Sequence, residues 1–484
     1  MPAAARGLVT LLQFQQRWRS AHCAPIIILF TVVTQYAHGR SQVWDELAGV
    51  TPTWSNEPLM DDSTRHWVET AAGGPILSVE RPDLGGSRHT HLVEIGGDHP
   101  RRLVVRGEAG GAFEGSEISV AREAQVYQAL LGTAVPVPEV LAVAPGGTAV
   151  LMERLEGTGD LLELSERARE RVVDELLEAV AALHLLDVEG LELPDLPRPT
   201  SPEDHARNDL GMWRRLLSHV EGPEPLLCYA GTYLHDIAPS EVPRTSLVQG
   251  DTGPGNLVAT EHGLSGLVDM EFAHIGDPHD DLAWILYRCE QLGIDHSRLI
   301  ERYTEHSGIP VNQAALDYYA AMVQFRCAVT SSLAATYGGA RGRAPYLLAT
   351  RRFLLKLGDA LAKLAGIVVP EPSLPDPPDT PRAAWFDHVD DYVRMGPRGT
   401  EEERTARREA RILLTYLRDY DRRGPALAEA ERDDRLAVLG IDDEGSALID
   451  AVERAGASQD AEVLGYLLRR GHRQAAPWSA LLDG

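Results

Sequence analysis

The sequence predicts an α+β protein with two unequal lobes and a further helical part at its C-terminal end. Short candidate strands separated by glycine pairs dominate residues 60–155, which we expect to form a small antiparallel-sheet lobe with one helix. Helical periodicity dominates residues 156–369, which we expect to form a larger lobe that also holds a short hairpin. Residues 370–382 are rich in proline and aspartate, which is linker composition, and residues 383–484 are predicted to form a separate helical domain.

Residues 1–59 are expected to be a poorly ordered extension, with the folded part beginning at Met60. Their continuous apolar run, Ala24–Val33, is too short to span a bilayer. Arginines precede this run, but His38 interrupts the small-residue pattern of a signal-peptide cleavage site. The four cysteines of the chain are far apart and form no disulfide or metal-binding pattern, so we expect a reducing, cytoplasmic location.

Along the small lobe, the pattern predicts three strands, one helix and two further strands. These are strands at 76–79, 90–95 and 102–106, a helix over 116–131 that Ser116 can cap, and strands at 139–143 and 149–154. Apolar residues of the helix recur on one face, and two prolines follow it, which favours a helix end there.

The large lobe is expected to begin with a long amphipathic helix that includes residues 172–183. Strand character returns at 246–248, 256–259 and 266–270, and helices are predicted to include 317–335 and 347–365. Beyond residue 383, apolar stripes with charged remaining faces predict more helices.

The charge balance excludes some partners. The chain carries 72 acidic and 46 basic side chains, a net charge of −26, so its field would repel nucleic acid and anionic membranes. Solubility alone explains this charge, and a cationic substrate is the second interpretation. Lysine occurs only at positions 356 and 363, so nearly every positive charge belongs to arginine.

The segment that carries chemistry runs from residue 249 to residue 283. It reads QGDTGPGN at 249–256, VDME at 268–271 and GDPHDDLA at 276–283. Phosphoryl transfer needs one carboxylate to orient the attacking hydroxyl, and further oxygen ligands to hold magnesium against the phosphates. Asp251 and Asn256 have the Asp-x-x-x-x-Asn spacing of a kinase catalytic loop, and Asp269 follows an apolar strand. Taken singly, the Asp–Asn pair could be turn chemistry and Asp269 a strand-end cap.

In this segment the chain resembles the aminoglycoside phosphotransferase family, within the protein-kinase-like and choline-kinase-like small-molecule kinases. The order of elements is similar over roughly residues 70–365, and the specific motifs span 249–283. The resemblance implies a bilobal protein-kinase-like fold that uses ATP and Mg²⁺. It implies that Asp251 is the catalytic base, that Asn256 and Asp269 are magnesium ligands, and that Asp281 mainly braces the loop.

The resemblance also assigns nucleotide-binding positions in the small lobe. Gly85, Gly86 and Ser87 would form the turn over the phosphates, although glycine pairs also mark ordinary hairpins. Arg106 would contact the phosphates and pair with Glu123, although the two could form a simple surface ion pair. Met152, Glu153 and Arg154 would lie beside the adenine at the lobe connection.

Two positions depart from the family pattern. Gln249 stands where a histidine usually precedes Gly-Asp, and glutamine can still form hydrogen bonds there. Arg106 fills a position often held by lysine, and arginine can grip phosphate bidentately.

The resulting hypothesis is transfer of the ATP γ-phosphoryl group to a hydroxyl of a small molecule, either aminoglycoside-like or another metabolite, including a cationic one. A catalytically silent, nucleotide-binding scaffold is the alternative, and a metal-assisted hydrolase is a third interpretation. His184 is expected to be a packed helix residue, whereas Trp213, Tyr229, Tyr233 and His235 could line an acceptor pocket or belong to the core. The oligomeric state is not indicated.

Overall fold

The computed structural model describes residues 60–81, 88–108, 113, 116–337, 343–368, 372, 374, 380, 382–396 and 399–482. The expected N-terminal extension and most of the expected linker therefore lie outside the described residues. Within the described ranges, no helix combines the length and the apolar character that crossing a bilayer would require.

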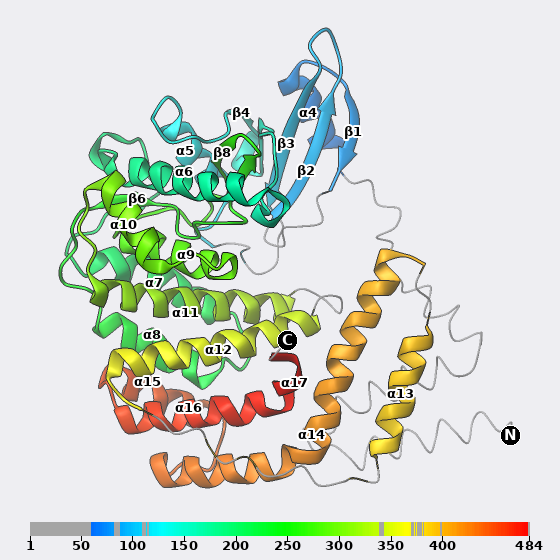
Figure 1. The fold of residues 1–484 in the computed structure, drawn as a ribbon, viewed down its shortest axis with the longest axis vertical. Helices are drawn as coiled ribbons and strands as arrows, with labels where there is room; N and C mark the ends of the chain where they lie inside the picture. The colour runs from blue at the N-terminus through cyan, green and yellow to red at the C-terminus, as the bar shows by residue number, and fades with distance from the viewer. Residues whose placement is uncertain are drawn as a thin grey trace, which may run out of the picture.

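The small lobe is built on a five-stranded antiparallel sheet with strand order β1-β2-β3-β5-β4 (Figure 1). Its strands are β1 (Ile76–Glu80), β2 (Arg88–Ile95), β3 (Arg101–Glu108), β4 (Val140–Val143) and β5 (Ala149–Glu153). All five agree with the sequence prediction to within two residues. Helix α4 (Asp62–Ala72), which the sequence analysis did not predict, precedes the sheet and contributes Val68 and Ala72 to a core with Val93, Val105 and Leu151.

Helix α5 (Val120–Leu130) lies between β3 and β4, as predicted, but it begins later than expected. Ser119, rather than Ser116, is its N-cap, and the Ser119 side chain accepts a hydrogen bond from the backbone N–H of Arg122. The Ser116 hydroxyl instead donates to the carbonyl of Phe113, 2.7 Å away. Both serines can form local bonds of this kind, so composition alone could not decide between them.

The large lobe is mainly helical. Its helices are α6 (Glu166–Leu185), α7 (Asp204–Leu217), α8 (Pro225–Asp236), α9 (His279–Cys289), α10 (His296–Ser307), α11 (Gln313–Tyr337) and α12 (Arg343–Ala365), with short 3-10 turns η3 (Leu161–Glu163) and η4 (Val188–Gly190). Two small antiparallel pairs join β6 (Ser246–Val248) to β9 (His274–Gly276), and β7 (Leu257–Thr260) to β8 (Gly263–Leu267). Strand β9 has only three residues and was not predicted from the sequence.

The C-terminal part of the chain is helical. Its helices are α13 (Ala383–Met395), α14 (Glu401–Leu439), α15 (Ser446–Ala457) and α16 (Ala461–Ala475), followed by η6 (Ala476–Trp478) and α17 (Ser479–Leu482). Helices α15 and α16 pack on the large lobe. Leu448 of α15 and Leu464 of α16 belong to the same hydrophobic cluster as Trp213 of α7 and Leu357 of α12. Helix α15 lies so close to α8 that a Cβ added to Gly456 would collide with Thr232 and the Tyr229 backbone.

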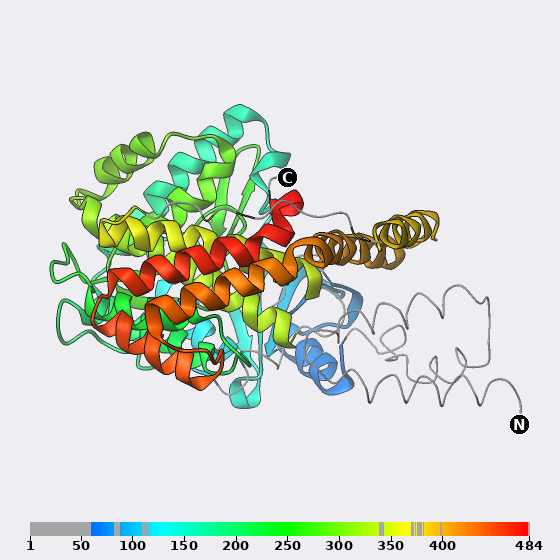
Figure 2. The ribbon, with the colours of Figure 1, turned by 90° about the horizontal axis from the view of Figure 1, so that it is seen from below.

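Helix α14 bends near its middle, where Pro425 lies inside the helix (Figure 1). A proline removes one helical hydrogen bond and kinks the helix. The part after the bend packs on α16, where the Tyr466 hydroxyl donates to Glu431 at 2.6 Å. The part before the bend pairs with α13 and projects from the body of the molecule (Figure 2).

The α+β, two-lobed architecture predicted from the sequence is confirmed. The segment after residue 383 was expected to be a separate module, and the structure instead places α15 and α16 in the core of the large lobe. The apolar stripe of α15, formed by Leu448, Val452 and Ala455, is the face that the large lobe covers.

Candidate active site

Residues 249–256 form a loop between β6 and β7 at the base of the small lobe. Gly250 adopts φ = 81°, in the left-handed region, and a Cβ there would lie 2.6 Å from the carbonyl oxygen of Phe272. Only glycine can combine this backbone conformation with such a close approach. The loop is therefore fixed by the sequence Gln-Gly-Asp itself.

A buried carboxylate anchors this loop. Asp281, in the first turn of α9, is fully buried, and its two oxygens accept bonds from the backbone N–H groups of Gln249 (2.8 Å) and Gly250 (2.9 Å). It also accepts from the Thr252 hydroxyl at 2.6 Å and lies 3.1 Å from Nε2 of His184. The bracing contact predicted for Asp281 is confirmed. His184 is packed in the helix, as expected, and its other ring nitrogen lies 2.7 Å from the Tyr303 hydroxyl.

Gln249, the residue that departs from the family pattern, is fully buried behind the loop. Its side-chain amide donates to the carbonyl of Val268 at 2.6 Å and to that of Asn256 at 3.4 Å. The bond to Val268 connects the loop to the segment that carries Asp269, and the bond to Asn256 closes the loop itself. Glutamine thus supplies the donor that this position requires.

Asp251 and Asn256 meet at the surface of the cleft. The Asn256 side-chain nitrogen lies 2.6 Å from Asp251 Oδ2 and 2.7 Å from the Asp251 carbonyl oxygen. The carboxylate keeps 18% of its side-chain surface exposed. Burial raises the pKa of Asp251 above its usual range; Arg288 opposes this effect and the charge of Asp269 reinforces it.

Asp269 lies two residues beyond β8 rather than at the strand end that we expected. Its φ of 63° is left-handed, which is uncommon for any residue other than glycine and concentrates at functional sites. Its backbone N–H donates to the buried Tyr127 hydroxyl of α5 at 2.8 Å, and its Oδ1 accepts from Arg106 at 2.9 Å. Contacts from the small lobe therefore hold this carboxylate at the lobe interface.

Arg106 joins the two lobes. Its Nε lies 3.2 Å from Glu123 of α5, while Nη2 binds Asp269 and lies 4.0 Å from Glu271. Against the effect of burial, the Asp269 and Glu123 carboxylates raise the pKa of Arg106, so the guanidinium stays charged. The structure thus brings Arg106 and Glu123 together, as an interior pair rather than a surface one.

The other expected nucleotide positions have mixed outcomes. Gly85, Gly86 and Ser87 lie outside the described residues. Met152 is buried in β5 opposite Val104 and Val140, Glu153 is exposed at the end of β5, and Arg154 follows it. Asp251 contacts Asn256, and Arg106 contacts both Asp269 and Glu123. The two sets are linked through backbone bonds of Val268, the residue before Asp269, whereas Met152, Glu153 and Arg154 lie at the lobe connection.

Comparison with known families decides the identity of this domain. Residues 81–319 match the sequence profile of the phosphotransferase enzyme family. These residues belong to that family. The match confirms the relationship inferred from the motifs at 249–283. No curated protein sequence matches the chain significantly.

Several solved structures resemble this chain. The ternary complex of aminoglycoside phosphotransferase APH(4)-Ia with ADP and hygromycin B is 18% identical and covers 61% of this chain and 98% of its own, with a TM-score of 0.43. The gentamicin complex of APH(2")-IIa is 16% identical, and the match covers 61% of this chain and 96% of that protein, with a TM-score of 0.43. The macrolide 2'-phosphotransferase MphH from Brachybacterium faecium is 17% identical, and the match covers 60% of this chain and 98% of that protein, with a TM-score of 0.43. These low identities leave the acceptor of this chain open.

Arg288 is the main site residue that sequence reasoning missed. From the last turn of α9 it forms an ion pair with Asp251 Oδ1 and donates to the Pro254 carbonyl at 2.8 Å. A Cβ at Gly253 would lie 2.8 Å from the Arg288 side chain, so this glycine leaves the space that the arginine occupies. A signal was present, because Arg288 follows Asp281 by seven residues and therefore lies on the same face of the helix.

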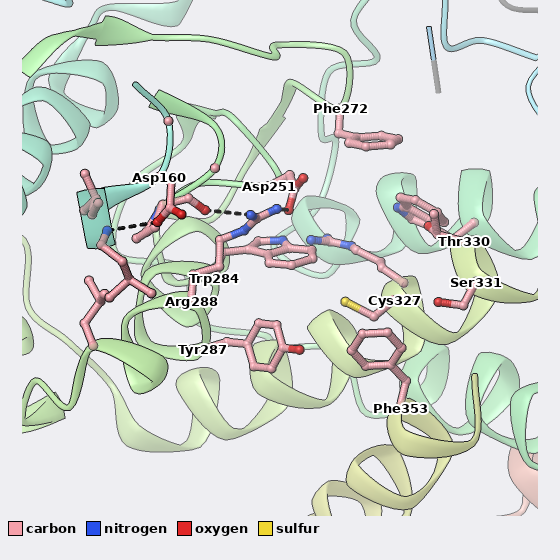
Figure 3. Close-up of a pocket in the computed structure, with 18 residues that line it drawn as sticks. Asp160, Asp251, Phe272, Trp284, Tyr287, Arg288, Cys327, Thr330, Ser331 and Phe353 are labelled. Atoms are coloured by element: carbon pink, nitrogen blue, oxygen red, sulfur yellow. Dashed lines mark hydrogen bonds and ion pairs between the residues drawn. The ribbon is translucent and has the colours of Figure 1, made fainter. Parts of the chain in front are cut away.

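A cavity of about 580 Å³ opens beside Asp251 in the large lobe (Figure 3). The catalytic loop, η3, α7, α9, α11 and α12 all contribute to its wall. Of the aromatic residues considered from the sequence, Trp213 lines this cavity, whereas Tyr229 and Tyr233 are buried in the core and stack on each other at 5.6 Å. His235 is partly exposed beside Asp236.

The oxygen atoms in the cleft fit a divalent cation. Because the Asn256 nitrogen faces two oxygens of Asp251, its carbonyl Oδ1 is the amide atom left for a ligand. Asp269 keeps 28% of its side chain exposed. Among the described residues, no three His, Cys, Asp or Glu side chains form a complete metal site by themselves. Mg²⁺ is usually bound by one or two protein oxygens, and phosphate oxygens and water complete its coordination.

Proposed function

We propose that this phosphotransferase moves the γ-phosphoryl group of ATP to a hydroxyl of a small molecule. The observation that carries the proposal is the position of Asp251. Its carboxylate accepts a bond from the Asn256 amide and also lines the 580 Å³ cavity. A base in this position can serve an acceptor in the cavity and a phosphate at the interface.

In the proposed reaction, the acceptor oxygen forms a bond to the γ-phosphorus while the bond from that phosphorus to the bridging β–γ oxygen breaks. ADP is the leaving group, and the hydroxyl proton passes to Asp251. Arg106 would bind phosphate oxygens, with Glu123 holding its guanidinium in place. Arg288 would keep Asp251 ionised and oriented.

Magnesium, when bound, would neutralise charge on the phosphates. Asn256 Oδ1 and the Asp269 carboxylate would hold it. Met152, Glu153 and Arg154 would border the adenine, and Gly85, Gly86 and Ser87 would cover the phosphates. We place the enzyme in the cytoplasm.

The test is the Asp251→Asn variant, which keeps the shape of the side chain but removes the base. We expect magnesium-dependent ATP binding to stay within about twofold of wild type and phosphoryl transfer to fall by at least about a hundredfold, in line with the contribution of a general base. Radiolabelled ATP with a panel of hydroxyl compounds measures the transfer, and calorimetry measures the binding. Asp236→Asn, on the surface beside His235, is the matched control.

Unchanged turnover in Asp251→Asn would reject Asp251 as the base. Magnesium-dependent ATP binding by the wild type, without transfer to any hydroxyl in the panel, would instead favour the silent scaffold.

A further inference from the structure

We infer that the acceptor is a hydroxyl compound of low charge that carries an aromatic or similarly flat apolar ring, rather than a polycation. This inference rests on the proposed function, because it concerns the cavity beside Asp251. It goes beyond that function by naming the chemistry of the acceptor. Three properties of the cavity wall support it.

The wall is unusually rich in aromatic side chains. Five of its 18 lining residues are aromatic, whereas aromatic residues make up 6% of the chain. They are Trp213, Phe272, Trp284, Tyr287 and Phe353. In Figure 3, Phe272 lies above the cavity, and Tyr287 and Phe353 lie below it. Aromatic walls on opposite sides favour a flat ring between them.

Three of the four charged side chains of the wall are already in ion pairs. Four charged side chains line the cavity: Asp160, Asp251, Arg288 and Arg326. Arg288 pairs with Asp251, and Arg326 forms buried ion pairs of 2.5–2.6 Å with Asp209 and Asp280. The remaining carboxylate, Asp160, accepts a bond from the Leu162 backbone N–H.

A polycationic acceptor would therefore meet the two guanidinium groups of Arg288 and Arg326. Asp160 is the one carboxylate of the wall that is not already in an ion pair. Binding several ammonium groups would require several carboxylates to replace the lost hydration. The net charge of −26, which raised the idea of a cationic substrate, does not extend into this wall.

The remaining groups add apolar surface and a few hydrogen-bonding positions. Burial raises the pKa of Cys327 to about 12, so its thiol stays protonated and is not a nucleophile. The hydroxyls of Thr330 and Ser331 lie on the same wall (Figure 3). An apolar pocket with a few polar groups is the usual design of a site for an uncharged organic molecule.

The experiment compares three probes on the full-length protein with Mg²⁺ and a non-hydrolysable ATP analogue. The probes are 4-nitrophenyl β-D-glucopyranoside, methyl β-D-glucopyranoside and kanamycin. Calorimetry measures binding, and radiolabelled ATP measures transfer. We expect the aryl glucoside to bind at least about tenfold more tightly than either other probe, because burying one ring is sufficient for that difference.

The Trp284→Ala variant should remove most of this preference. Trp385→Ala is the matched control, because Trp385 is 64% exposed on α13, and this variant should keep the preference. Phe353→Leu, a milder change on another wall, should weaken it by about threefold or more and serves if Trp284→Ala does not fold. Binding of the ATP analogue verifies that each variant is folded.

Tighter binding of kanamycin than of the aryl glucoside, or equal binding of the two glucosides, would overturn the inference. If the enzyme phosphorylates kanamycin in that case, the proposed function still stands. Failure of the proposed function has a different signature: the aryl glucoside would bind as expected, but neither it nor any compound of the panel would be phosphorylated.

Discussion

The sharpest prediction concerns the carboxylate that anchors the catalytic loop. Changing Asp281 to asparagine keeps its size but replaces one acceptor oxygen with an NH₂ group. That group would face either the Gln249 N–H and His184, or the Gly250 N–H and Thr252. In both orientations, one buried backbone N–H loses its acceptor.

The expected loss follows from these contacts. An unsatisfied buried N–H costs about 1–3 kcal/mol, and each of the two bonds kept by the remaining oxygen weakens by about 1 kcal/mol when the acceptor loses its charge. Asp281 is fully buried, so solvent does not reduce these values. The free energy of unfolding should fall by about 3–5 kcal/mol.

Denaturation in guanidinium chloride, followed by tryptophan fluorescence, measures this change. Trp213 and Trp284 report on the large lobe that contains the loop. The comparison is valid if the dependence on denaturant keeps its slope. Asp295→Asn is the control, because this N-cap of α10 makes no side-chain capping bond, and it should change stability by less than about 0.5 kcal/mol.

A loss below about 1 kcal/mol in Asp281→Asn, with an unchanged slope, would refute the reasoning, since a single bond of ordinary strength would explain it. Turnover should also fall, because the backbone N–H groups that Asp281 holds flank Asp251. A variant with the expected loss of stability but wild-type turnover would show that the loop keeps its shape without this anchor.

Three further predictions concern other contacts of the large lobe. Arg288→Met should raise the pKa of Asp251, because burial already raises it and the opposing cation is lost, so the acid limb of the kcat/KM profile should move to higher pH. An unmoved limb, as expected for the exposed Arg298→Met, would contradict this. Arg326→Met leaves two buried carboxylates without their cation and should cost about 3–5 kcal/mol in denaturation; a cost below about 1 kcal/mol would mean that neighbours compensate. Ending the chain at Gly440 removes Leu448 and Leu464 from the core, and the buried surface of each side chain contributes about 1.5–3 kcal/mol to stability. Thermal unfolding of this variant should therefore lose its cooperativity. A sharp transition at the wild-type temperature would show that the large lobe folds without α15 and α16.

Most of the fold and the centre of the candidate site could be predicted from local sequence patterns. The strands of the small lobe and the motifs at 249–283 are short-range patterns, and Asp251, Asn256 and Asp281 need few distant residues to be recognised. The exact ends of the elements were less certain. Helix α5 is capped by Ser119 rather than Ser116, and Asp269 lies two residues beyond β8 rather than at its end. A strand as short as β9 has too few residues for a periodic signal.

The acceptor side could not be predicted in the same way. Arg288, Arg326, Trp284 and Phe353 come from three helices, and each is an ordinary residue of an amphipathic helix when taken alone. Their convergence depends on helix packing, with contacts that join residues 37 to 117 positions apart in the chain. Gly253 and Gly255, where a Cβ would lie within 3.0 Å of the Arg288 side chain, were visible in the loop, but glycine in a turn has a simpler explanation.

The use of Arg106 at the lobe interface has a practical consequence. Nucleotides that carry an acyl phosphate label kinases by acylating an amine beside the bound phosphates. A guanidinium stays protonated and is a poor nucleophile, and both lysines of the chain, Lys356 and Lys363, are on α12. Such reagents would therefore find no amine at position 106, and Lys356, 5.1 Å from the Tyr287 ring of the cavity wall, is the lysine that they could reach.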